Sequence, residues 1–165
     1  ARGITLVRDD SHLLPLRLAA DQRIFVVAWR GPVSRAIDAR YTPEAFVTAI
    51  RAHHGGVSAA VLSGAPTAGD IEALREKVAS AEVTLLLTLN AHRDPAQAEA
   101  MRALAAAARH AIVIAVADPY DAATLSDVPT ALATYDYSAP ALEAAAHALF
   151  SQDAPPGRLP VRLGV

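Results

Sequence analysis

Two adjacent carboxylates, Asp9 and Asp10, stand just before His12 in the stretch LVRDDSHLLPL. Carboxylates beside a histidine are the groups that acid–base catalysis and metal binding use. An acid–base pair, however, needs two carboxyl groups in different environments. Asp9 and Asp10 are neighbours in a polar segment after an apolar run, and Asp and Ser favour turns by bonding to nearby backbone. We therefore interpret this stretch as a turn in which both carboxylates are solvated.

Polar residues also follow several later apolar runs, at the points where predicted strands end. Asn90, His92 and Arg93 follow the run VTLLLTL, and Asp118 and Tyr120 follow AIVIAVA. Ligands of open parallel sheets bind at the carboxyl ends of the strands. These side chains would then form one polar rim that recognises a polyhydroxylated ligand. The alternative is structural, because residues at such positions also cap the following helices and neutralise one another.

Two further stretches suggest a nucleophile or a metal ligand, but neither has the pattern that the chemistry requires. Ser63 in VLSGA ends a predicted strand, yet the G-x-S-x-G pattern of a serine hydrolase lacks its first glycine. His53 and His54 are adjacent in the predicted last turn of a helix, where their side chains point about 100° apart. Neither G-x-G-x-x-G nor a P-loop occurs. We therefore predict no metal and no cofactor.

The composition is that of one globular domain. The chain has 165 residues, of which 53% are hydrophobic, and its formal net charge is -2. This hydrophobic content excludes a disordered chain, and the weak negative charge gives no electrostatic footprint for nucleic acid or an anionic membrane. There is no cysteine, and no apolar stretch approaches the roughly 20 residues that span a bilayer. We predict a single domain over residues 1–165.

The chain opens with ARGITLV, without an initiator methionine or a signal peptide. We therefore expect a piece of a longer protein, from which any targeting segment has been cut away. The compartment, bacterial cytoplasm or outside the cell, stays open.

Six short apolar runs predict strands. Three of them, IFVVAW, VTLLLTL and AIVIAVA, are nearly continuous rather than alternating, which is typical of strands covered on both faces of a sheet. The predicted strands span Ile4–Val7, Ile24–Trp29, Val57–Leu62, Val83–Leu89, Ile112–Ala117 and Thr130–Tyr135.

Helix start signals lie between these runs. Thr42–Pro43 is an N-cap followed by proline in the first turn. Thr67 and Asp70 resemble a capping box, and DPAQ at Asp94–Gln97 repeats the same logic. Ser138 would cap a last helix. Strand and helix thus alternate at the spacing of parallel crossover units.

We predict an α/β fold from this order, namely a three-layer α/β/α sandwich around a mostly parallel sheet of about six strands. Its appearance would be flavodoxin-like. The first two predicted strands connect without a helix, so at least one strand is expected to be antiparallel.

The two ends of the chain resemble one known family. A strand, a polar turn and LLPL at Leu13–Leu16 resemble the opening of the C-terminal domain of family 3 glycoside hydrolases. GRLPV at Gly157–Val161 is similar to the closing pattern of that domain. Between them, TLNAHRDPAQ, VADPYD and DVPTALATYDYSAPALEA resemble the bacterial β-N-acetylhexosaminidase branch. The match spans nearly the whole chain, with its segments in order.

This resemblance implies an α/β sandwich domain that follows a catalytic (β/α)8 barrel in the same polypeptide. The parent enzyme would hydrolyse β-linked N-acetylglucosaminides or related β-glycosides by a retaining mechanism, with both catalytic groups outside this chain. The chain is too short for a barrel, which needs about 250 residues. We therefore assign no catalytic residue and expect the isolated chain to be inactive. Its role would be to pack on the barrel and stabilise it.

Two hypotheses from other classes stay open. In one, the chain is a stand-alone α/β module that binds a small molecule or a sugar through Asn90, His92, Asp118 and Tyr120, residues that would otherwise line the outer edge of the parent's substrate cleft. In the other, it is a small α/β hydrolase with Ser63 as the nucleophile. Without its barrel, the domain would expose an apolar or arginine-rich face that favours self-association.

Overall fold

The computed structural model describes residues 3–31, 41–153, 155, 157–159 and 163. Its strands are β1 (Thr5–Asp9), β2 (Ile24–Arg30), β3 (Val57–Ser63), β4 (Val83–Thr88), β5 (Ala111–Ala115) and β6 (Thr130–Ala133). Its helices are α1 (Pro43–Arg51), α2 (Ala68–Ser80), the single 3₁₀ turn η1 (Ala91–Arg93), α3 (Pro95–Ala107), α4 (Tyr120–Thr124) and α5 (Ala139–Phe150). Each predicted strand is present within two residues of its predicted ends.

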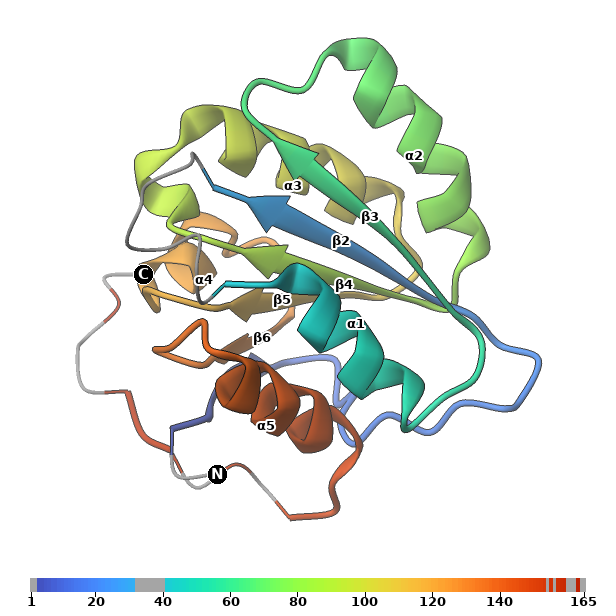
Figure 1. Cartoon of the computed structure of the whole chain (residues 1–165), viewed down its shortest axis with the longest axis vertical. Helices are drawn as coiled ribbons and strands as arrows, with labels where there is room; N and C mark the ends of the chain where they lie inside the picture. The colour runs from blue at the N-terminus through green and yellow to red at the C-terminus, as the bar shows by residue number, and fades with distance from the viewer. Residues whose placement is uncertain (1–2, 32–40, 154, 156, 160–162, 164–165) are drawn as a thin grey trace.

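The six strands form one sheet in the order β1-β6-β5-β4-β2-β3 (Figure 1). β2 to β6 are parallel, whereas β1 pairs antiparallel with β6 at one edge. Without β1, this is the strand order of flavodoxin-like doubly wound sheets, in which the strand order reverses at the boundary between β2 and β4. The predicted fold and its antiparallel strand are therefore confirmed. We call the side where the five parallel strands end the carboxyl edge, and the opposite side the amino edge.

Helices cover both faces of the sheet. α1 and α5 pack against each other on one side, and α2 and α3 pack together on the other (Figure 1). β4, β5 and β6 are buried along their whole length, and β2 is buried except at its last residue. This is the physical reason for the continuous apolar runs, since a strand between two helix layers has no solvent face. No described helix combines the length and apolar character that crossing a membrane requires.

Two of the predicted helix caps form as expected. The Thr67 hydroxyl accepts a hydrogen bond from Asp70 N (3.2 Å), and Thr67 N donates to the Asp70 carboxylate (2.7 Å). This is the reciprocal capping box at the start of α2. At the start of α3, Asp94 accepts from Gln97 N (3.1 Å). These bonds satisfy backbone donors that have no partner within the helix.

Two other predicted caps differ in detail. Thr42 and Ser138 stand at the N-cap positions of α1 and α5, but neither side chain makes a capping bond. The Ser138 hydroxyl donates to the Asp136 carboxylate instead (2.8 Å). The sequence did not predict α4, because five residues are too few to show a 3.6-residue pattern.

The interpretation of the opening stretch as a solvated turn is right for Asp10 and wrong for Asp9. Asp9 is the last residue of β1, and one carboxylate oxygen accepts from Leu13 N and from the Thr130 hydroxyl, both at 2.9 Å. The other oxygen accepts from Leu14 N (3.1 Å). Asp9 thus fixes the chain that enters LLPL. Its bonds are to backbone and a hydroxyl, so the stretch is structural.

The placement of His53 and His54 in a last helical turn is also wrong. α1 ends at Arg51. The hydrogen bond after it is of the shorter i to i−3 kind, from His53 N to Ile50 O (2.9 Å). The His53 ring stacks on Phe150, with ring centroids 4.9 Å apart. His54 Nε2 bonds to the Gln22 carbonyl oxygen (2.7 Å). Across the part of the chain that the structure describes, no group of three or more His, Cys, Asp or Glu side chains could hold a metal ion.

Candidate functional site

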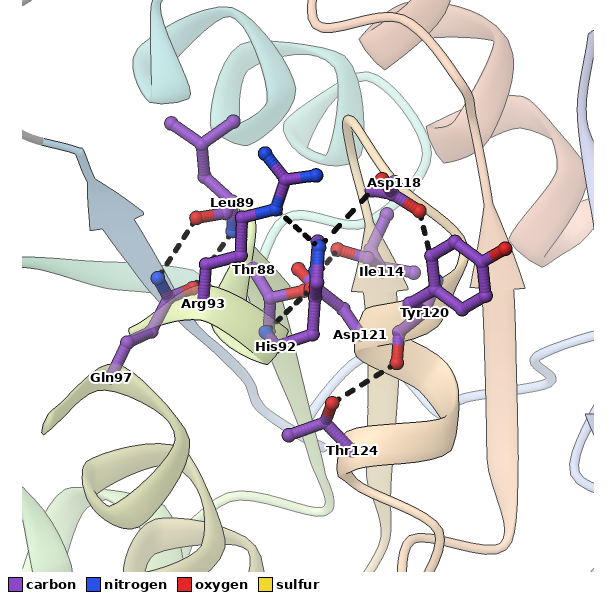
Figure 2. A network of polar contacts seen from close by, with 10 residues as sticks. All are labelled: Thr88, Leu89, His92, Arg93, Gln97, Ile114, Asp118, Tyr120, Asp121 and Thr124. Carbon is purple, nitrogen blue, oxygen red and sulfur yellow. Dashed lines mark hydrogen bonds and ion pairs between the residues drawn. The ribbon is translucent and has the colours of Figure 1, made fainter. Parts of the chain in front are cut away.

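Three of the predicted rim residues come together at the carboxyl edge (Figure 2). His92 lies in η1, after β4, and Asp118 and Tyr120 follow β5. His92 Nε2 is 3.8 Å from an Asp118 carboxylate oxygen, and the His92 and Tyr120 rings have centroids 5.7 Å apart. With Asp121, which binds His92 on its other side, these residues form what we call the rim cluster: His92, Asp118, Tyr120 and Asp121.

Asp121 is the member of the cluster that the sequence did not reveal. Its Oδ1 accepts from the backbone N–H of His92 (3.0 Å) and bonds to His92 Nδ1 (2.9 Å). The side chain is fully buried, and its Oδ2 has no hydrogen-bond partner among the described residues. A buried carboxylate is rare unless it is paired, and here the pair joins η1 to α4. The second Asp of VADPYD was the available signal, but nothing local marks it as buried.

Asp118 has the structural role predicted from the sequence, whereas its role in recognising a ligand stays a prediction. Its Oδ1 accepts from Tyr120 N (3.3 Å) at the start of α4, which is the structural role. Its Oδ2 faces His92, and 28% of the side chain is exposed. Tyr120 itself is 41% exposed, an unusual exposure for a large aromatic residue in this fold. The cluster therefore presents one carboxylate oxygen and one aromatic ring to solvent beside His92.

Asn90 lies on the same edge, but no hydrogen bond links its side chain to the rim cluster within the described residues. It has a left-handed backbone (φ 56°), which asparagine tolerates better than most residues. The residue before it is fixed by a buried glutamine: Leu89 N donates to Gln97 Oε1 (2.8 Å), and Gln97 Nε2 donates to Leu89 O (2.9 Å). The turn that carries His92 is therefore held from inside the fold.

Arg93 is the exposed neighbour of the cluster. Its Nε–H donates to His92 Nε2 (3.0 Å), so the two side chains meet at the surface (Figure 2). The bond occupies the one ring nitrogen of His92 that Asp121 does not hold. An exposed arginine is held weakly in such a contact, because its charge is screened by solvent.

Aromatic residues gather on the carboxyl edge, and Tyr120 is the one that the sequence predicts there. The chain has four tyrosines and one tryptophan. The Tyr41 hydroxyl donates to Trp29 O (2.8 Å) at the end of β2, and the Tyr41 ring meets Tyr137 edge-on, with centroids 6.5 Å apart. Tyr135, after β6, has a left-handed backbone (φ 56°), which is strained for an aromatic residue. Such strain clusters at functional sites.

Ser63 does not have the surroundings of a nucleophile. It ends the exposed edge strand β3, and in the described part of the chain no histidine or carboxylate bonds to its hydroxyl. Nucleophilic serine needs an adjacent base. The hydrolase hypothesis therefore has no structural support.

A cavity of about 460 Å³ opens toward the amino edge, and one of its lining residues, Leu125, bonds through its N–H to the Asp121 carbonyl oxygen (3.0 Å). Its walls come from the end of α3 and the segments before β5 and β6 and are mostly alanine, leucine and valine. The nearby cations are already engaged, since Arg102 donates to Thr124 O (2.9 Å) and Arg109 pairs with Glu82 (3.3 Å). The cavity has the size of a ligand pocket, and Ser11, His110 and Asp127 also line it. We favour the rim cluster as the candidate site because a buried carboxylate, Asp121, holds its histidine, whereas no buried polar side chain lines the cavity.

No protein-family model matches this chain, and no curated protein matches it. Solved structures do match. The chain is similar to a family 3 β-N-acetylglucosaminidase from Paenibacillus sp., with a TM-score of 0.83 and 26% identity over 97% of this chain and 30% of that one. It is also similar to a fungal multi-domain family 3 β-N-acetylglucosaminidase, with a TM-score of 0.78 and 25% identity over 96% of this chain and 18% of that one.

A β-glucosidase from Listeria innocua has the same fold, with a TM-score of 0.71 and 17% identity over 92% of this chain and 24% of that one. The resemblance to the C-terminal domain of family 3 glycoside hydrolases is thus confirmed. The identity is higher to the two β-N-acetylglucosaminidases than to the β-glucosidase. The chain spans less than a third of the length of each of these proteins.

Proposed function

We propose that residues 1–165 are the non-catalytic C-terminal domain of a longer glycoside hydrolase, on whose catalytic barrel the domain packs. One observation carries this proposal: nearly all of this chain, but under a third of the Paenibacillus enzyme, takes part in the structural match. A domain that matches one section of a larger enzyme over its whole length most simply does the work of that section.

The parent enzyme, in this proposal, hydrolyses β-linked N-acetylglucosaminides with retention of configuration. Such a reaction needs one carboxylate as the nucleophile and a proton donor for the leaving group, and both would lie in the barrel. The described glutamates support this division. Glu82 lies before β4 at the amino edge and pairs with Arg109, and Glu44 lies in the first turn of α1 and pairs with Arg30. The other glutamates, Glu72, Glu76, Glu99 and Glu143, lie within helices, so no glutamate stands in a described loop that follows a strand at the carboxyl edge.

The intact mass of the native protein tests this proposal first. Immunocapture from the source cell, followed by mass spectrometry, should give a chain several times larger than 17.2 kDa. Peptides upstream of residue 1 should read as a (β/α)8 barrel, with strands and helices alternating over about 250 residues. A native mass near 17.2 kDa would contradict the accessory role.

A second candidate function is a stand-alone sugar-binding module. The contact of His92, Asp118 and Tyr120 favours it, because carboxylate, imidazole and an exposed aromatic ring recognise hydroxyl groups and the apolar face of a sugar. The mass of the native protein separates the two functions, since a module that acts alone would have a native mass of 17.2 kDa. Within the longer enzyme, the same residues together with Asn90 would form the outer edge of the substrate cleft.

A further inference from the structure

We propose that Asp121 is a positioning residue that holds His92 as a hydrogen-bond acceptor, so that His92 Nε2 and Asp118 together bind neighbouring hydroxyls of an uncharged pyranose. Tyr120 would receive the apolar face of the sugar ring. This inference deepens the sugar-binding role proposed for the rim and rests on it. It adds Asp121, which acts through His92, and it names uncharged sugars as the class of ligand that the rim cluster selects.

The two neighbours of the His92 ring independently require the same tautomer. Asp121 Oδ1 lies 2.9 Å from His92 Nδ1, and an ionised carboxylate can only accept, so Nδ1 carries the proton. Arg93 Nε lies 3.0 Å from His92 Nε2, and a guanidinium can only donate, so Nε2 presents its lone pair. His92 is therefore neutral, with Nδ1–H directed inwards and an acceptor directed outwards.

The ring cannot readily turn to exchange the two nitrogens. Asp121 Oδ1 also accepts the backbone N–H of His92 (3.0 Å), so one oxygen holds both the residue's main chain and its ring. Asp121 is fully buried, and 17% of the His92 side chain is exposed. Electrostatic interactions are strong where water is excluded. The second oxygen of Asp121 is buried without a partner among the described residues, so both of the hydrogen bonds that the Asp121 side chain makes are to His92.

Outside the ring, the surface offers acceptors. Asp118 Oδ1 accepts from Tyr120 N, whereas Asp118 Oδ2 makes no hydrogen bond within the described residues and lies 3.8 Å from His92 Nε2. Two acceptors at this separation suit a ligand with two adjacent donors, which is the arrangement of a vicinal diol. An uncharged sugar meets this requirement. An anionic sugar is repelled by Asp118 and by the buried charge of Asp121.

Arg93 covers Nε2 in the free protein and is the group that a ligand displaces. It is exposed and makes one bond to an uncharged nitrogen, so its displacement costs little. Tyr120 is 41% exposed and tilted 55° to the His92 ring, which places an aromatic surface beside the acceptor pair. Aromatic side chains of this kind supply binding area with little loss of conformational entropy.

Nitrogen-15 NMR of the histidine rings at pH 8 tests the tautomer directly on the 165-residue chain. We expect His92 to show a protonated Nδ1 and an unprotonated Nε2. Asp121→Asn removes the charge beside Nδ1 and should raise the population of the Nε2–H form, which donates instead of accepting. A wild-type His92 with Nε2–H, or an unchanged tautomer in Asp121→Asn, would overturn the positioning role.

Titration of amide resonances with N-acetylglucosamine and with glucuronate tests the ligand class. Binding of the uncharged sugar should shift the resonances of η1 and α4, and His92→Phe should weaken it about tenfold, the equivalent of one neutral hydrogen bond. Asp121→Asn should weaken it in proportion to its tautomer change. Arg75→Ala, which alters an exposed arginine on α2, is the matched control and should bind as the wild type does.

The outcomes separate this inference from the proposed accessory function. Equal or tighter binding of glucuronate, or no saturable binding of N-acetylglucosamine by the wild type, would overturn the ligand class. Neither result bears on the native mass, which alone decides whether the chain belongs to a longer enzyme. A spectrum of each variant without ligand should show that the variant is folded. A loss of binding then reflects a change at the site and not unfolding.

Discussion

Gln97 pairs with Leu89 as a neighbouring strand would, since its side-chain amide accepts from the Leu89 N–H (2.8 Å) and donates to the Leu89 carbonyl (2.9 Å). Gln97 is fully buried in the first turn of α3. It thus extends the hydrogen bonding of β4 by one residue and fixes the point from which the rim turn departs. The turn that carries His92 is therefore held by the core.

Gln97→Leu should destabilise the fold by about 2–4 kcal/mol, because the Leu89 N–H and carbonyl are left buried without partners while the volume is nearly kept. Urea unfolding followed by circular dichroism measures the change. Gln152→Leu is the matched control, since Gln152 is exposed and bonds only to the Arg17 guanidinium at the surface. Equal effects of the two substitutions would contradict the assigned role of Gln97.

Arg8→Met should also cost about 2–4 kcal/mol of stability, because three carbonyl groups lose a charged donor. The Arg8 guanidinium donates to the carbonyl oxygens of Ala122 (2.8 Å), Leu125 (2.7 Å) and Val128 (2.6 Å) and so ties β1 to α4 and to the turn after it. Burial lowers the pKa of Arg8, which reflects the partly dry site.

Arg8→Lys distinguishes the geometry of these bonds from the charge. A lysine ammonium lacks the planar fork of arginine, so it should recover less than half of the loss. Chemical denaturation of the three proteins gives the comparison. Full recovery by lysine would show that charge alone matters at this position.

Gly157→Ala should detach the C-terminal segment from β1 and lower stability by about 1–3 kcal/mol, the usual cost of overpacking. Gly157 N donates to Ile4 O (2.9 Å), and a Cβ at Gly157 would overlap the Ile4 carbonyl oxygen and the Thr5 hydroxyl. Gly55→Ala is the control, because nothing lies within 4 Å of a Cβ built there. Thermal unfolding of both variants checks the difference.

Tyr41 should make the fold sensitive to alkaline pH. Burial raises the pKa of the Tyr41 hydroxyl above its usual value of 10.0. Two smaller effects oppose each other, because the charge of Arg30 lowers this pKa and the charge of Glu44 raises it. The folded state then keeps the proton while the unfolded chain releases it. The contribution of Tyr41 to stability is fully present below pH 10 and is lost as pH rises above it, by at most about 1.4 kcal/mol per pH unit.

Tyr41→Phe removes this dependence, and it also removes the bond to Trp29 O. Urea unfolding from pH 8 to 11 should give a smaller loss of stability for the variant than for the wild type, although the variant is less stable at pH 8. Parallel pH profiles would mean that Tyr41 titrates normally in the folded state. Tyr120→Phe is a suitable control, because Tyr120 is 41% exposed.

Much of this structure could be predicted from the sequence, because it depends on local patterns. The buried strands β2, β4 and β5 show as continuous apolar runs, and the capping box of Thr67 and Asp70 shows as two residues at fixed spacing. The resemblance of the chain's two ends to one family could also be seen in the sequence. In the fold these two ends meet, since Gly157 bonds to Ile4.

The sequence predicts three residues of the candidate site but not the fourth, Asp121, and the reason is physical. His92, Asp118 and Tyr120 could be selected because each follows a strand, and parallel strands end at one edge of a sheet. Burial and pairing depend instead on which loops meet there. The chain by itself determined a parallel α/β domain with a polar edge. The tertiary structure decided that Asp9 and Arg8 serve the backbone and that Asp121 is buried against His92, since each of these roles depends on atoms that the sequence separates and the fold brings together.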